Sequence, residues 1–124
     1  MHTIQQDMAP KVYDKVQGAQ RKDKTERDRY GSMALKLPVL VRQAGLIQAV
    51  TFVETRGKAG HKALLEDLAQ VVDGQTAADF LRQCREADLG SYMWLTRQTL
   101  SALEWFKRFA QSVLDAKPGQ EGEP

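Results

Sequence analysis

The sequence is short of the residues that bind metals or cross-link a chain. Of its 124 residues one is cysteine, Cys84, and two are histidine, His2 and His61. A lone cysteine excludes an internal disulfide and suits a reducing compartment, so we expect a cytoplasmic protein. Cysteine and histidine do not occur at zinc-ligand spacing, and we predict neither a metal site nor a cofactor. His61 lies on an apolar helical line and is interpreted as a partly buried packing residue.

Long apolar runs are missing as well. Charged residues make up 27% of the chain, and they interrupt every hydrophobic stretch before it reaches the roughly 20 residues of a membrane span. Residues 1–11 also lack the apolar segment of a secretory signal. We therefore expect no membrane among the partners of this protein.

No pattern of catalytic residues stands out. The sequence contains no GxGxxG, P-loop, HExxH or GxSxG motif, and its glycines are placed like helix ends and turns. A serine or cysteine nucleophile would need a nearby base, which only His61 or His2 could supply. The adjacent acids Glu66 and Asp67 are interpreted as part of a solvated face. We predict that the chain is not an enzyme.

Apolar residues at helical spacing are what the sequence has in quantity. Hydrophobic residues make up 42% of the chain, and they recur three and four positions apart with no alternating, strand-like stretch. A chain of 124 residues is long enough for one hydrophobic core. We predict an all-α fold, with a single compact domain of five to six helices at residues 1–116 and a disordered tail at 117–124.

Glycine and proline set the expected limits of the first helices. The first helix should begin near Met8, with Pro10 in its first turn. The charged segment 20–31 should be either a mobile loop or a solvated helical end. Pro38 should kink the next helix or mark its start, and Gly45, with a left-handed backbone, should separate two helices.

The second half of the chain shows similar signals. Residues 58–74 should form a helix that ends at its final glycine. Thr76 should cap a short helix, because Asp79 three residues later makes a pattern close to a capping box. A long last helix should run over residues 92–116 and lie at the centre of the fold with the helices of 30–57.

Charge is divided unevenly along the chain. Residues 1–62 carry 12 lysines and arginines against 6 acids, residues 63–124 carry 6 against 10, and the net charge is +2. This division favours head-to-tail association or contact with a polyanion, although two ordinary solvated faces would give the same pattern. Solubility alone could also explain each basic residue that we predict to contact nucleic acid: Arg21, Lys22, Lys24, Arg27, Arg29, Arg42, Arg56, Lys58 and Arg108.

Two tryptophans mark a second face of the last helix. Trp94 and Trp105 are eleven residues apart, so they lie within about 20° of each other on an ideal helix. They are nearly opposite the apolar arc that contains Phe106. Three explanations stay open: another helix covers this face, the tryptophans anchor a partner protein, or they stack on single-stranded bases beside Arg108.

Two stretches of the sequence resemble a known family. Residues 30–53, "YGSMALKLPVLVRQAGLIQAVTFV", combine a tyrosine, a Lys-x-Pro turn, a Gly-Leu junction and an apolar helix that ends in phenylalanine. Residues 104–110, "EWFKRFA", are near the end of the predicted last helix, which begins with Tyr92. In this order and at this chain length, they are similar to the small all-helical subunit of the type III-B CRISPR effector, the Cmr complex or RAMP module.

The resemblance implies a non-catalytic subunit in antiviral defence. Several copies would stack head to tail, associate with the other Cmr subunits and help to hold the guide RNA and the target RNA. Two other hypotheses remain. The chain could be a helical adaptor that oligomerises without nucleic acid, or an independent RNA-binding or DNA-binding regulator.

Overall fold

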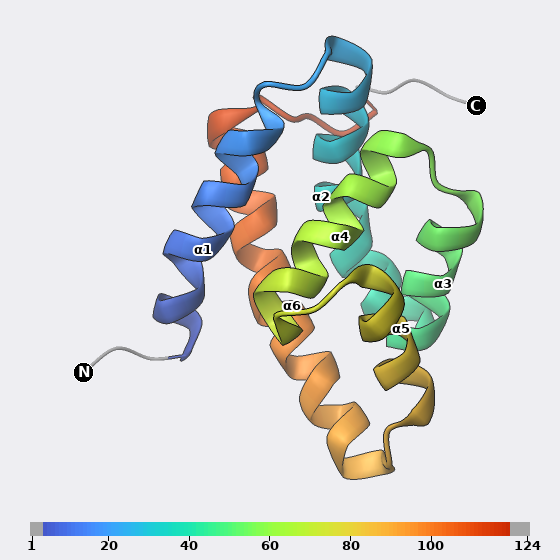
Figure 1. The fold of residues 1–124 in the computed structure, drawn as a ribbon. Coiled ribbons are helices and arrows are strands. Elements are labelled where there is room, and N and C mark those ends of the chain that lie inside the picture. The colour runs from blue at the N-terminus through green and yellow to red at the C-terminus, as the bar shows by residue number, and fades with distance from the viewer. Residues whose placement is uncertain (1–3, 120–124) are drawn as a thin grey trace.

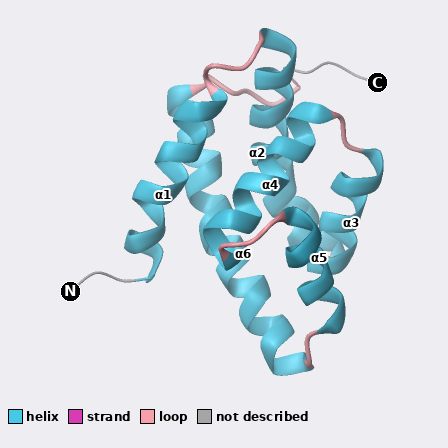
Figure 2. Ribbon diagram, in the orientation of Figure 1, coloured by secondary structure: helices cyan, strands magenta, loops and turns pink. Residues whose placement is uncertain are grey.

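The computed structural model describes residues 4–119, and this part of the chain consists of helices and loops (Figures 1 and 2). The fold is all-α, as the apolar spacing predicts. None of its helices has the length and apolar composition of a membrane span. The predicted tail at 117–124 lies outside the described residues from position 120 onward. In chain order the six helices of the described part are α1 (Ile4–Ala19), α2 (Lys24–Ala44), α3 (Leu46–Arg56), α4 (Ala59–Asp73), α5 (Ala77–Glu86) and α6 (Leu89–Val113).

The long helix α6 is the centre of the packing. It lies against α1, α2 and α4, while α5 packs on α3 and α4 (Figure 1). The buried face of α6 consists of Leu95, Thr99, Ala102, Leu103, Phe106 and Ala110. Burying such a face removes apolar surface from water, at roughly 25 cal/mol per Å².

Helix α1 begins earlier than the sequence predicts. Its first residue is Ile4, so Pro10 lies inside the helix and not in its first turn. Pro10 is exposed, and on the solvent side of a helix water can replace the hydrogen bond that proline cannot donate. Tertiary packing outweighs this local cost, because one stripe of the helix is buried: Met8, Val12, Val16 and Ala19.

The charged segment 20–31 is divided between a turn and a helix. The Asp23 carboxylate accepts a hydrogen bond from the Glu26 N–H at 2.8 Å and so caps α2, which begins at Lys24. The helical interpretation of the segment is therefore confirmed from Lys24 onward. Pro38 is buried inside α2, so it does not mark a helix start.

Helices α2 and α3 meet at Gly45, as predicted. The backbone of Gly45 has φ +92° and ψ 159°. This is not the left-handed helical conformation that we expected but an extended one at positive φ, which essentially only glycine adopts. The Gly45 N–H donates to the Val41 carbonyl at 3.0 Å, and the Gly45 carbonyl accepts from the Ala49 N–H at 3.0 Å. One residue thus ends one helix and starts the next.

The predicted signals for α4 and α5 are confirmed. Gly74 ends α4 in the left-handed conformation, with φ +68° and ψ 17°. The Thr76 hydroxyl accepts a hydrogen bond from the Asp79 N–H at 3.2 Å and caps α5. His61 is half-buried, and its Nδ1 accepts from the Lys58 N–H at 2.9 Å, so it also helps to cap α4.

The limits of α6 differ from the predicted ones. Asp88 caps the helix by accepting a hydrogen bond from the Ser91 N–H at 2.8 Å, so α6 begins at Leu89. It ends at Val113, before the predicted Ala116. Beyond that end Asp115 takes φ +56°, and the Ala116 N–H donates to the carbonyl of Ala110 at 3.0 Å. The helix therefore ends with a residue in the left-handed conformation. That residue is an aspartate and not the glycine that usually signals such an end in a sequence.

The geometry of Gly45 gives a test of the junction. Replacing Gly45 with alanine should lower the free energy of unfolding by about 1–3 kcal/mol, because a side chain is strained at that φ and ψ. Urea denaturation followed by circular dichroism measures the change. Gly18→Ala is the matched control, since Gly18 lies in α1 with no atom within 4 Å of an added Cβ. It should leave stability unchanged or raise it, and an equal loss in both variants would contradict the assignment.

Candidate nucleic-acid and protein interfaces

The predicted basic cluster lies around the turn between α1 and α2. Arg21 and Lys24 are exposed, and the Lys24 ammonium is 2.8 Å from the Asp28 carboxylate. Surface ion pairs of this kind contribute about 0–1 kcal/mol and exchange readily with solvent. Both residues are therefore accessible to a polyanion.

Three members of the cluster are partly enclosed by the fold. Lys22, Arg27 and Arg29 are half-buried. The Arg27 guanidinium donates to the carbonyl oxygens of Gln20 and Lys22 at 3.5 Å and 3.3 Å, respectively. Arg27 therefore ties the turn to the start of α2, a structural role that competes with phosphate contact.

The fold adds one end of α4 to this region. A Cβ atom on Gly60, in the first turn of α4, would lie 2.4 Å from the Glu26 carbonyl and 2.8 Å from Arg29 Cβ. Only a glycine allows the starts of α2 and α4 to approach so closely. Lys58, exposed just before α4, thus belongs to the same end of the molecule as the cluster. Arg56 is exposed at the end of α3, on the other side of the α3–α4 turn.

The structure separates Arg42 from that end. Arg42 lies near the end of α2, 3.9 Å from the Glu104 carboxylate, with both side chains substantially exposed. Arg108 is on the last turns of α6, and the end of this helix lies at the α1–α2 turn, where the Gln20 side chain donates to the Val113 carbonyl at 3.4 Å. Arg108 lies over the Trp105 ring, 5.5 Å from its centroid. The nine predicted nucleic-acid residues therefore do not form one continuous surface.

The two tryptophans share a helix face but not an environment. Trp105 is half-buried and stacks on Phe109, with ring centroids 5.5 Å apart and planes at 20°. Phe109 in turn forms a T-shaped pair with Tyr13 of α1, with ring centroids 5.2 Å apart. We call these three rings the aromatic ladder, and it joins α6 to α1. Trp94, three turns earlier, is 49% exposed because α6 is not covered in the same way there.

A buried polar link was missed by the sequence prediction. Asp67 is half-buried and accepts a hydrogen bond from the Tyr30 hydroxyl at 2.6 Å, which joins α4 to α2. Its neighbour Glu66 accepts from the Ala77 N–H at 3.1 Å. The interpretation of both acids as a solvated face was therefore wrong. Nothing in the local pattern distinguishes them, because their partners are distant in sequence.

Burial controls the ionisation of this pair. Desolvation raises the pKa of the Asp67 carboxyl, and the Tyr30 hydrogen bond and the charges of Lys15 and Lys22 lower it in part. Desolvation and the nearby carboxylate raise the pKa of the Tyr30 hydroxyl, which stays protonated. Burial also raises the pKa of the Cys84 thiol to about 11, so this cysteine is a poor nucleophile.

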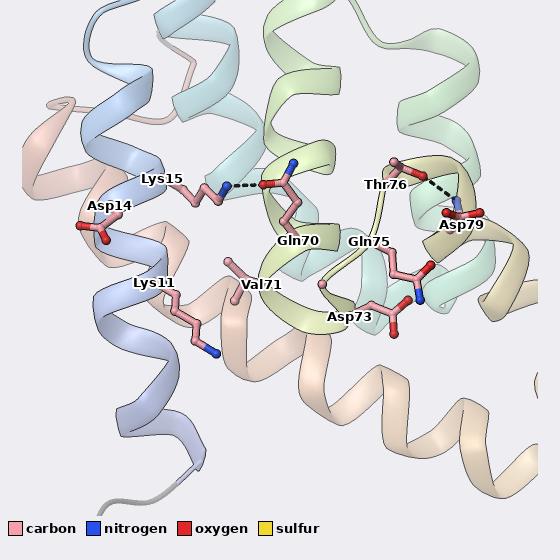
Figure 3. A pocket seen from close by; sticks show the side chains of 10 residues that line it. Lys11, Asp14, Lys15, Gln70, Val71, Asp73, Gln75, Thr76 and Asp79 are labelled. Atoms are coloured by element: carbon pink, nitrogen blue, oxygen red, sulfur yellow. Dashed lines mark hydrogen bonds between the residues drawn. The ribbon is translucent and has the colours of Figure 1, made fainter.

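A polar cleft lies between α1 and the α4–α5 turn (Figure 3). Lys11 and Lys15 project into it from α1, and Lys15 hydrogen-bonds Gln70 of α4. Asp73 and Asp79 line its opposite side. Desolvation raises the pKa of Asp73. The hydroxyl group of Thr76, which also lines the cleft, caps α5 by accepting a hydrogen bond from the Asp79 N–H.

The chain is similar to known proteins in both sequence and structure. Residues 4–113 match the family described as CRISPR-associated protein (Cas_Cmr5). The CRISPR system Cmr subunit Cmr5 of Thermus thermophilus is 51% identical over 115 residues, which are 93% of this chain and 99% of that protein. The crystal structure of a CRISPR-associated Cmr5 family protein from the same organism matches with a TM-score of 0.86 at 52% identity, over 92% of this chain and 99% of that one.

The fold and the surface together define a class of protein. It is a small six-helix bundle with a basic end and exposed aromatic and apolar side chains. More particularly, the chain belongs to the CRISPR-associated Cmr5 family, because the family match spans nearly all of it. The resemblance noted in residues 30–53 and 104–110 is confirmed.

The Tyr30–Asp67 link predicts a pH-dependent stability. Because the pKa of folded Asp67 is raised, the folded state binds a proton more tightly than the unfolded one, and this residue reduces stability as pH rises through its folded pKa. Asp67→Asn keeps a hydrogen-bond acceptor without the charge. The free energy of unfolding of the Asp67→Asn variant, minus that of the wild type, should therefore increase from pH 3 to pH 7. Urea denaturation at several pH values measures this difference.

Tyr30→Phe is the companion variant for this measurement. It removes the hydroxyl that donates to Asp67 and lowers the pKa of that carboxyl. The free energy of unfolding should fall by about 1–3 kcal/mol, because the Asp67 carboxylate loses its hydrogen-bond donor. A stability difference between Asp67→Asn and the wild type that does not change with pH would contradict the proposed ionisation.

The aromatic ladder predicts an intermediate cost for Trp105→Ala. A fully buried aromatic side chain costs about 3–5 kcal/mol when truncated, whereas Trp105 is half-buried and we expect about 1–3 kcal/mol. Thermal and urea unfolding measure this, with the helical circular dichroism signal retained. Trp94→Ala is the matched control and should cost less. If the two variants lose equal stability, the ladder does not fasten α1 to α6.

Proposed function

We propose that this chain is a non-catalytic subunit of a type III-B CRISPR ribonucleoprotein that targets RNA in antiviral defence. Copies of it stack head to tail, associate with the other Cmr subunits and help to hold guide RNA and target RNA in the cytoplasm. The observation that carries the proposal is the match over nearly the whole chain to a Cmr subunit at 51% identity.

The arrangement of charge supports the stacking. The turns α1–α2 and α3–α4 lie at one end of the bundle (Figure 1) and carry Arg21, Lys24 and Lys58. The turns before and after α5 lie toward the other end, with Asp73 before it and Asp88 after it. The two ends therefore carry different groups, and a contact between unlike surfaces repeats along a filament rather than closing a symmetric pair.

The exposed cations at the basic end support contact with RNA. Arg21, Lys24 and Lys58 are accessible there, and cations spaced along one surface are what the phosphate backbone requires. The structure gives less support to Arg27 as an RNA contact, because its guanidinium already donates to two carbonyl oxygens of the α1–α2 turn. The half-buried Trp105 is a weaker candidate for stacking on bases, because its ring is already stacked on Phe109.

The salt dependence of target-RNA binding tests the RNA contact. In the assembled Cmr complex, Arg21→Gln with Lys58→Gln should weaken binding and reduce the slope of log affinity against log salt by about 0.7 for each lost phosphate contact. Filter binding at several salt concentrations measures this slope. Arg82→Gln is the control, because Arg82 is an exposed cation on α5 and is not among the residues predicted to contact RNA.

Two results would count against the proposal. An unchanged salt slope in the double variant removes the basic end from the path of the RNA. Tight, sequence-selective binding of RNA or DNA by the isolated chain would favour an independent regulator over a subunit that acts only within its complex.

A further inference from the structure

Two apolar surfaces of the described chain are left open by the fold. The first, which we call the α6 tip, consists of Leu89, Met93 and Trp94 on the first turns of α6. These side chains are 74%, 49% and 49% exposed, respectively. Figure 1 shows that this end of α6 projects beyond α1 and α4. Exposed large side chains on a projecting helix end are typical of a protein contact and not of a free surface.

The second surface is concave. We call it the α2–α3 groove, a hollow of about 480 Å³ between the end of α2 and the outer face of α3. Leu40 and Ile47 are half-buried in its wall, and the Phe52 side chain, 51% exposed, is its largest open apolar group. The groove is therefore shaped and lined to accept apolar side chains.

The groove and the hollow beside Trp94 each have one charged lining residue, and the two are of opposite sign. Arg56 is the one charged residue that lines the groove. Glu86 is the one charged residue that lines the hollow beside Trp94, and neither Arg85 nor Arg97 lines it. A single pair of this kind at the edge of an apolar contact adds orientation and specificity more than affinity, which comes from the apolar anchors.

Neither surface covers the other within one chain, because both remain exposed in it. We propose that the α6 tip of one copy docks in the α2–α3 groove of the next, with Glu86 facing Arg56. The inference rests on the proposed self-association and names the surfaces that carry it. It also assigns Arg56, predicted as an RNA contact, to a contact between copies.

Single substitutions test the two halves of the contact. Met93→Lys in the tip and Phe52→Ala in the groove should each weaken self-association of the full chain at least tenfold, measured by sedimentation velocity over a range of concentrations. Both side chains are about half exposed, so circular dichroism should show the fold unchanged. Val39→Lys is the matched control, because Val39 is 47% exposed on α2 but does not line the groove, and it should leave association unchanged.

Mixing variants tests whether tip and groove meet each other. A copy with Met93→Lys keeps its groove, and a copy with Phe52→Ala keeps its tip. A mixture should therefore form a mixed dimer more tightly than either variant alone associates with itself. Arg56→Glu and Glu86→Arg should likewise each weaken association, and a mixture of the two should restore it through the reversed pair. Variants that fail to rescue one another when mixed overturn the proposed contact.

The failure of this inference is distinguishable from failure of the proposed function. If the wild type associates and both Met93→Lys and Phe52→Ala associate equally well, the tip and groove are wrong while stacking stands. If the wild type stays monomeric alone and no two copies are adjacent in the reconstituted Cmr complex, the proposed stacking fails together with this inference.

Discussion

The burial of one face of α6 is the interaction on which the rest of the structure depends. Phe106 and Leu103 on that face are fully buried, and three other helices pack against it. With 25 residues, α6 is roughly 37 Å long, whereas α1 has 16 residues and covers only part of it. The first turns of α6 therefore extend past their neighbours. The exposed tip is a consequence of this mismatch in length.

The alternation of helix directions decides where charge collects. Because α1 to α4 run up and down in turn (Figure 1), the α1–α2 and α3–α4 turns meet at one end of the bundle. The missing side chain of Gly60 then lets α4 approach the start of α2. A cluster that is local in sequence at residues 21–29 thereby gains Lys58 from a distant position. Other basic residues, such as Arg42, are left on a different part of the surface.

Much of the fold could be predicted from the sequence, because its signals are local. The helical period of the apolar residues, the cap at Thr76 and the glycines at 45 and 74 each act over a few residues, and the structure agrees with them. Predictions that depend on distant partners were less successful. Pro10 lies inside α1 because packing compensates for its missing donor, and Asp67 is half-buried because Tyr30 reaches it from another helix.

The sequence by itself determined that this is an all-α chain of about six helices, and two of its stretches were enough to point to the family. It did not determine which polar and aromatic residues are available to a partner. Trp94 and Trp105 lie on one helix face, yet α1 contacts only the second through the aromatic ladder. Exposure depends on which helix passes over a residue, and that follows from contacts between residues far apart in the chain.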